Sequence, residues 1–332
     1  MTTISDVARH AGVSPATVSR VLNGSSPVSD DRADRVRQAA ADLGYQPSGP
    51  ARALRRQRTT VWAAIVADVQ NPFFTTMIRG VEDVAQAADH RLVLCNSDED
   101  PAKESAYVDV AIADRVAGVI IAVSSASRAS LERLQRAGVP VVAVDRRPKG
   151  DGIDSVVVDG RAGARQAVEH LLDGGAQRVG IVTGPRRVST AESRLSGYRA
   201  ALKARGIEVD PALVRHSDFR EEGGRAATLA LLDGDDPPDA LFVANNLMTL
   251  GALRALRERG RRVPRDVAIV GFDDAPWTTL ITPALTVVAQ PTYELGRQAA
   301  ELLITAGPDR SPRHLVLRPE LVVRGSSIPP NR

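Results

Sequence analysis

The feature that most constrains the fold is an alternation of short apolar runs with longer amphipathic stretches, from residue 61 to about residue 271. Such runs are typical of fully buried strands, and the stretches between them have helical periodicity. This alternation predicts parallel sheets with helices on both faces. The strands are too many for one compact sheet, so we predict two doubly wound α/β lobes with a cleft at the carboxyl ends of their strands. The predicted strands are 61–66, 91–95, 118–123, 139–144, 155–158, 178–183, 240–244 and 267–271, and the predicted helices are 74–88, 102–113, 131–137, 161–172, 192–205, 222–232 and 248–259.

Two short helices separated by a tight turn are predicted ahead of this region, within residues 3–23. Thr3 can cap the first helix with Asp6 in the capping-box position, and Gly12 supplies the turn. Ser14 can cap the second helix, with Pro15 at its first position. A third helix follows, with Ser29 as its expected cap. The inward apolar faces are Ile4, Val7, Ala8 and Ala11 in the first helix, Val18, Val21 and Leu22 in the second, and Ala33, Val36, Ala40 and Leu43 in the third, which Gly44 ends.

The outward face of the second helix carries Pro15, Ala16, Thr17 and Arg20, as expected of a helix-turn-helix whose second helix enters the DNA major groove. Residues 1–58 contain nine arginines and five acids, a net charge of +4, which leaves −1 of the total of +3 for the rest of the chain. Contact with phosphates requires positive charge of this kind. A helical bundle with no nucleic-acid role is the alternative, and the polar and basic outward face disfavours it.

Composition and motifs disfavour several other classes of protein. An apolar run of about 18 residues, enough to span a membrane, is missing, and the N-terminus lacks a signal-peptide pattern, so we expect a cytoplasmic protein. The single Cys95 allows no internal disulfide and is expected to be a buried small residue. Nucleophile-elbow, Walker, dinucleotide-binding and paired His/Cys metal motifs are missing, so we expect no enzyme activity, cofactor or metal. An exported solute-binding protein would explain the lobes but not the basic N-terminal segment.

Several motifs occur in a characteristic order along the chain. They include Asn-Pro-Phe-Phe at 71–74 and Val-Gly-Phe-Asp-Asp at 270–274, together with residues 3–24, 45–48, 51–54, 194–198, 282–286 and 319–324. In this combination the chain resembles the LacI/GalR family of bacterial transcription regulators over essentially its whole length. The resemblance implies a homodimer, with a tetramer left open. Each subunit would have a helix-turn-helix headpiece (1–46), a hinge helix or linker (47–60), and an effector-binding and dimerisation core (61–332).

The core of that family is related to periplasmic sugar-binding proteins, and the chain crosses between its two lobes three times. We place these crossings near residues 159–160, 289–290 and 319. Lobe one would comprise about 61–158 plus 291–318, and lobe two about 161–288 plus 320–332. An effector bound between the lobes would change their angle and so control DNA binding, as an inducer or as a corepressor.

On the DNA side, the family positions that match Pro15 and Ala16 contact bases. Both residues are small and apolar here, which favours contact with thymine methyl groups. Arg20 could bind a guanine bidentately, a contact worth ~1–3 kcal/mol of discrimination. The alternative for Arg20 is a phosphate contact, which adds affinity without specificity. Further phosphate contacts are expected from Ser5, Thr17, Ser19, Asn23 and Arg32.

Leu54 matches the family residue that enters the DNA minor groove. Two hinge helices of a dimer would each insert this leucine at the central base step, usually C-G, of a palindromic double-stranded operator and kink it. Packing between the two hinge helices is the alternative role, and the two are compatible. Arg52 and Arg55 would lie beside the phosphates, with Arg56.

On the effector side, the resemblance and the strand-end rule predict a cleft that suits a sugar or sugar derivative. Carboxylate, amide and guanidinium groups around an aromatic wall can pair with hydroxyls that both donate and accept. Any of these residues could instead be a cap or turn residue, and Phe74 is expected to belong to the core. Val188, where purine-binding members carry a charge, disfavours a purine. The family often has Asp where this chain has Asn246, and Trp277 could reach the cleft or only pack. The predicted cleft residues are Phe73, Phe74, Asp145, Thr190, Arg194, Phe219, Asn245, Asp273 and Gln290.

Overall fold

The computed structural model describes residues 2–23, 27–45, 59–124, 128–148, 152–307 and 310–328. The chain forms two compact units, Met1–Thr59 and Thr60–Arg332. The predicted hinge residues Arg52, Leu54 and Arg55 lie outside the described residues, as does the side chain of Asn23.

The first unit contains α1 (Ile4–Ala11), α2 (Pro15–Asn23) and α3 (Asp30–Asp42). The predicted capping box of Thr3 and Asp6 is confirmed, and Gly12 adopts φ 64° in the turn. The backbone N–H of Thr17 donates to Ser14 Oγ over 3.2 Å, which confirms the second cap. Ser29 is the N-cap residue of α3, as predicted, but its side chain makes no cap hydrogen bond; the carboxylates of Asp30 and Asp31 in the first turn stabilise this helix end. The three helices enclose a small core of Val7, Ala8, Ala11, Val18, Val36, Ala39 and Ala40.

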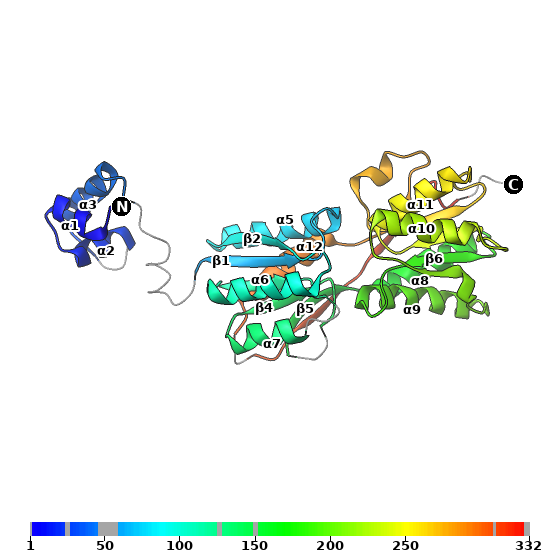
Figure 1. Ribbon diagram of the computed structural model, residues 1–332, viewed down its shortest axis with the longest axis horizontal. Helices are drawn as coiled ribbons and strands as arrows, with labels where there is room; N and C mark the ends of the chain where they lie inside the picture. The colour runs from blue at the N-terminus through cyan, green and yellow to red at the C-terminus, as the bar shows by residue number, and fades with distance from the viewer. Residues whose placement is uncertain are drawn as a thin grey trace. The chain divides into compact units, whose positions relative to one another are not determined.

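The second unit contains two six-stranded sheets, which confirms the two-lobe α/β prediction (Figure 1). The strands of lobe one follow the order β11 (His314–Leu317), β5 (Asp154–Val158), β4 (Val141–Val144), β3 (Gly118–Ile121), β1 (Val61–Val66) and β2 (Arg91–Asn96), all parallel. Those of lobe two follow the order β12 (Glu320–Val322), β10 (Thr286–Ala289), β9 (Ala268–Phe272), β8 (Ala240–Val243), β6 (Val179–Thr183) and β7 (Val214–His216).

The outer strand β12 runs antiparallel to β10, so the second sheet is not wholly parallel. The reason is the last crossing between the lobes, where only Arg318 and Pro319 separate β11 from β12. The parallel strands of both sheets end at the interface between the lobes. A strand that enters lobe two from this interface must therefore run against its neighbours.

Helices cover both faces of each sheet (Figure 1). In lobe one, α5 (Pro72–Ala87) and α12 (Thr292–Ile304) lie on one face, and α6 (Pro101–Ala113) and α7 (Arg128–Arg136) on the other. In lobe two, α8 (Gly160–Asp173) packs with α9 (Ser189–Ala204), and α10 (Glu221–Leu232) packs with α11 (Asn246–Glu258). Two short 3-10 helices, η1 (Pro211–Leu213) and η2 (Pro276–Thr279), complete lobe two.

The chain passes between the lobes three times, and each crossing is short. The crossings connect β5 to α8, β10 to α12 and β11 to β12. They leave one residue between Val158 and Gly160, and two residues each after Ala289 and Leu317. Since three short segments join the lobes at one place, their relative motion is restricted to a hinge at these crossings.

Three sequence expectations for the core need correction or completion. Cys95 is only half-buried, because β2 is the edge strand of its sheet and carries exposed side chains. Trp277 packs against the core of lobe two and does not line the cavity that lies between the lobes at the carboxyl ends of their strands. The elements β7, β10, β11, β12 and α12 are missing from the predicted set.

None of the described helices has the length and apolar character needed to cross a membrane.

The contact between α5 and α12 depends on two glycines. A Cβ atom at Gly296 would overlap the carbonyl oxygen of Met77, and one at Gly80 would overlap that of Tyr293. The two helix backbones are therefore in direct contact where the helices cross.

This contact reverses the usual effect of replacing a helical glycine. Glycine to alanine ordinarily stabilises a helix by about 1 kcal/mol, whereas overpacking costs about 1–3 kcal/mol. We expect Gly296→Ala to lower the free energy of unfolding, measured by urea denaturation. Gly307→Ala, where a Cβ meets no atom, is the control and should be neutral. A Gly296→Ala variant as stable as this control would contradict the close contact.

Candidate functional site

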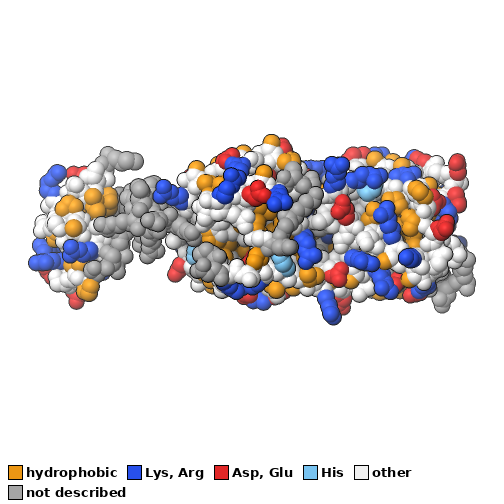
Figure 2. Space-filling view, turned by 90° about the horizontal axis from the view of Figure 1, so that it is seen from below, with side chains coloured by type: hydrophobic (Ala, Val, Ile, Leu, Met, Phe, Trp, Pro, Cys, Tyr) orange, Lys and Arg blue, Asp and Glu red, His pale blue; other side chains and the backbone are white. Residues whose placement is uncertain are grey.

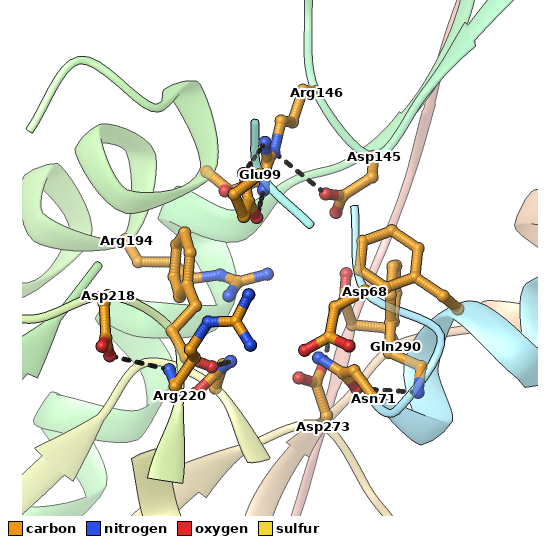
Figure 3. A pocket seen from close by; sticks show the side chains of 15 residues that line it. Asp68, Asn71, Glu99, Asp145, Arg146, Arg194, Asp218, Arg220, Asp273 and Gln290 are labelled. Carbon is orange, nitrogen blue, oxygen red and sulfur yellow. Dashed lines mark hydrogen bonds and ion pairs between the residues drawn. The ribbon is translucent and has the colours of Figure 1, made fainter. Parts of the chain in front are cut away.

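A cavity of about 470 Å³, including space open to solvent, lies between the two lobes at the carboxyl ends of their strands (Figure 3). The lining includes all nine predicted cleft residues, brought together from both lobes. Six further residues line it that the sequence did not single out as cleft residues: Asp68, Asn71, Glu99, Arg146, Asp218 and Arg220.

Three lining side chains are held by an unusual backbone conformation. Asp145 directly follows β4 with φ 62°, and Asp273 directly follows β9 with φ 76°. Phe219 has φ 64°. Positive φ is rare outside glycine, and local strain of this kind occurs preferentially at functional sites. The strand ends therefore direct two carboxylates and one aromatic ring to the same cavity.

The two carboxylates are buried, and their electrostatics differ from those of surface acids. Burial raises the pKa of Asp145 to about 6, although Arg146 and Arg194 act in the opposite direction. Burial also raises the pKa of Asp273, opposed by Arg194 and by a hydrogen bond from Gln290. Both groups thus remain costly to ionise and gain from any hydroxyl that donates a hydrogen bond to them.

Two buried arginines balance this negative charge. Arg194 is 5% exposed; its Nη1 donates to the carbonyl of Ala244 over 2.5 Å, and its Cζ lies 3.9 Å from the ring centroid of Phe272. Burial lowers the pKa of Arg194. Arg146 forms a two-hydrogen-bond ion pair with Glu99 and also donates to the carbonyl of Val123 over 3.2 Å. The two Nη atoms of Arg146 are therefore already engaged, and the Nε of Arg146 and of Arg194 are both without a hydrogen-bond partner among the described residues.

Aromatic side chains line the cavity from both lobes. Phe73 and Phe74 pack edge to face with ring centroids 5.1 Å apart. Both line the cavity, and both are buried in the core of lobe one, as expected for Phe74. Opposite them, Phe219 lies against Gly184, where a Cβ would overlap the ring. A flat ligand face could contact these rings while its edge pairs with the polar groups.

Four of the six unpredicted lining residues show which signals the sequence analysis missed. Arg146 directly follows the predicted Asp145, so the strand-end rule could have included it. Asp218 and Arg220 flank Phe219 after β7, a strand too short to show an apolar run. Glu99 follows β2 in a loop with no sequence signal of its own. In the part of the chain that the structure describes, no group of three or more His, Cys, Asp or Glu side chains is placed to hold a metal ion.

The predicted DNA-contacting face is largely accessible in the N-terminal unit. Pro15, Ala16 and Arg20 are exposed on α2, and Ser5 and Arg32 are exposed on α1 and α3. Thr17 is half-buried, with its hydroxyl 3.0 Å from Ser14 Oγ, and Ser19 is only 9% exposed. A phosphate contact by Ser19 is accordingly the least supported of these predictions. On the face of the larger unit shown in Figure 2, both basic and acidic side chains are exposed.

Comparison with known proteins decides the family. Residues 3–48 match the family described as bacterial regulatory proteins, lacI family, and residues 168–327 match the periplasmic binding protein-like domain. The ribose operon repressor of Halalkalibacterium halodurans is 39% identical over 304 residues, covering 92% of this chain and 90% of that protein. This chain belongs to the LacI family. It is a DNA-binding transcriptional regulator.

Other LacI-family relatives match over nearly the full chain. Catabolite control protein A of Priestia megaterium is 34% identical over 91% of each chain. Among solved structures, a complex of the transcriptional regulator CelR with cellobiose is 36% identical, with TM-score 0.75, covering 98% of this chain and 100% of that one. The lac repressor dimer bound to operator and the anti-inducer ONPF is 28% identical, with TM-score 0.84, over 98% and 99% of the two chains.

The raised pKa of Asp145 in this LacI-family regulator predicts a pH-dependent stability. The folded chain holds this proton up to about pH 6, whereas an unfolded aspartate loses it near 3.8. The free energy of unfolding therefore falls as the pH rises between these values. Above about pH 6 the buried Asp145 is ionised, and the loss of stability reaches its full size. A difference of about two pKa units corresponds to at most about 3 kcal/mol.

We expect Asp145→Asn to raise the free energy of unfolding at about pH 7.5, by up to that amount, and to change it little at about pH 4. Urea denaturation at the two pH values measures the difference. An equal effect at both pH values would show that Asp145 does not carry the shifted pKa.

Proposed function

We propose that this LacI-family regulator is a repressor whose operator affinity is controlled by a neutral sugar bound between the core lobes. It would act as a cytoplasmic homodimer, with a tetramer left open, and by binding rather than by catalysis. The observation that carries the proposal is the convergence of all nine predicted residues on one cavity between two lobes, in a chain that also has a helix-turn-helix unit.

The chemistry of the cavity favours a polyhydroxylated ligand. Acceptors such as Asp145 and Asp273 lie near the donor Arg194, and amide side chains offer both kinds of group. The aromatic rings of both lobes suit the apolar C–H face of a sugar ring. Relatives support the same class, since solved LacI-family structures include a cellobiose complex and one with bound ribose.

The charge balance of the cavity favours a neutral ligand over a phosphorylated one. The lining contains five carboxylic acids and three arginines, and one arginine is paired with Glu99. A phosphate group would be buried beside an excess of acids without a free cluster of cations. Such a like-charge placement is costly in a site of low dielectric constant.

A dimer is supported by the outer edge of lobe one. The strand β2 is an edge of its sheet, and its Val93 and Leu94 are 50% and 44% exposed. Val110 on α6 of the same lobe is 55% exposed. Exposed apolar side chains beside an unpaired strand edge are characteristic of protein interfaces.

Control of DNA binding would follow from differential affinity. An effector shifts the equilibrium between two lobe arrangements only by the difference in its affinity for them. An effector that favours the DNA-competent arrangement acts as a corepressor, and one that favours the other arrangement acts as an inducer.

A sugar panel tests the effector class. We expect a neutral mono- or disaccharide, ribose and cellobiose being the first tested, to raise the melting temperature of the full chain. The same sugar should change operator affinity. Asp273→Asn should abolish the thermal shift because it replaces one of the two buried acceptor oxygens with an amide donor and removes the charge. Stabilisation by a sugar phosphate or a purine, with none by neutral sugars, would contradict the proposal.

The DNA mechanism is tested by selecting bound sequences from a random duplex pool with the full chain. We expect a palindrome with a central C-G step. On that operator, Leu54→Ala should weaken binding far more than it weakens binding to random DNA, because only the specific site offers the step that the leucine would enter. Arg9→Ala, outside the predicted contact set, serves as the control.

Equal losses on operator and random DNA would exclude minor-groove insertion by Leu54. A selection that enriches no site, with or without the active sugar, would contradict sequence-specific repression itself.

A further inference from the structure

One pair of amide side chains connects the two lobes directly. Asn246 Nδ2, at the start of α11 in lobe two, donates to Asn71 Oδ1, at the start of α5 in lobe one, over 2.9 Å. Both residues are buried, with 1% and 7% exposure. Among the side-chain hydrogen bonds within the described ranges, the other one that crosses the lobes is a 3.5 Å contact from Arg220 to the carbonyl of Asp98.

The two ends of this bond are not equivalent. Asn71 Oδ1 also accepts from the backbone N–H of Phe73 over 2.9 Å and thereby caps α5. It keeps that donor when the lobes separate. Asn246 Oδ1, in contrast, accepts no hydrogen bond from any described residue although it is buried. Closure of the lobes therefore gives Asn246 one hydrogen bond and leaves its other polar atom without a partner from the described chain.

The hydrogen bond gained and the acceptor left unpaired nearly cancel, so the contact contributes little net free energy to closure. The net gain from one hydrogen bond is modest, and burial of an unpaired acceptor costs at least as much. If Asn71 could no longer accept, both polar atoms of Asn246 would be unpaired on closure, and the penalty would be larger. If Asn246 were then also removed, the penalty would disappear.

We propose that Asn71 is a positioning residue for closure of the core in the absence of effector: by accepting from Asn246 it removes the penalty that this buried amide would otherwise impose on the closed arrangement. Asn71 lines the cavity between the lobes and caps α5, the helix that carries Phe73 and Phe74. Asn246 lines an adjoining hollow that shares Phe73, Asp273 and Gln290 with the cavity. The pair thus acts on the effector site through lobe closure, since a smaller closed fraction lowers the apparent affinity of any ligand that needs both lobes.

The experiment measures the distance between the lobes without any effector. Spin labels are placed at the exposed positions Gln86 in lobe one and Glu208 in lobe two of the full chain carrying Cys95→Ser. Labelled chain is diluted into excess unlabelled chain, and the distance distribution is recorded by double electron–electron resonance. The variants are Asn71→Ser, Asn246→Ala and the double variant. Serine at 71 retains a side-chain oxygen that can cap α5 but is too short to reach Asn246.

We expect Asn71→Ser to lower the closed-to-open ratio by about tenfold, the effect of unpairing one buried polar group. Addition of Asn246→Ala should restore the ratio to near that of the parent chain. Asn246→Ala alone should have a small effect, because Asn71 Oδ1 keeps the N–H of Phe73. Ser155→Ala is the control: it removes the 2.8 Å hydrogen bond between the buried Ser155 and His314 within lobe one and should leave the distances unchanged.

A purely structural role predicts different results. Effects of the two single variants that add in the double variant would overturn the proposal, as would an Asn71→Ser distribution identical to that of the parent chain. A parent chain that shows only the longer distance would also overturn it. Rescue of the distance distribution by the second substitution cannot arise from a general loss of stability.

Discussion

The rest of the core depends on one topological constraint: three short crossings bring the carboxyl ends of two sheets to a single interface. This constraint places the cavity, because strand-end residues from both lobes converge there. It also explains why β12 runs against its sheet, since the last crossing delivers the chain to lobe two at that interface. Because the chain passes between the lobes at these three crossings, a small rotation there changes the distances across the cavity.

Charge burial determines what such a cavity can bind. Burial raises the pKa of Asp145 and of Asp273, so ionising either carboxyl is unfavourable. Arg194 interacts electrostatically with both carboxylates. The opposite charges nearby allow these three side chains to be buried, but they do not use all of the hydrogen-bonding capacity of the three groups. A ligand with many hydroxyls satisfies these groups without adding charge, whereas an ionic ligand would disturb the balance.

The sequence predicts the strongly apolar strands and the cavity residues that follow them, because burial on both sheet faces produces continuous apolar runs. Asp145, Asn245 and Asp273 could be placed by that rule alone. It fails for β7 and β11, which are short edge strands with half-exposed side chains, and for Asp218 and Arg220, which depend on β7. The contact between Asn71 and Asn246 could not be predicted, because it joins residues 175 positions apart in different lobes. Ser29 occupies the predicted N-cap position without a side-chain hydrogen bond, because a suitable residue type there does not ensure that its hydroxyl bonds to the helix.

The positive φ angles of Asp145 and Asp273 limit how the ligand preference of this scaffold can evolve. Aspartate, asparagine and glycine tolerate the left-handed region, whereas β-branched and bulky residues are strained there. Only a few residue types are therefore expected to be tolerated at these two positions. Changes of ligand should accumulate instead at helical positions such as Thr190 and Phe73, where the backbone accepts almost any side chain. A library aimed at a new ligand would gain most from diversity on those helices, with both carboxylates held fixed.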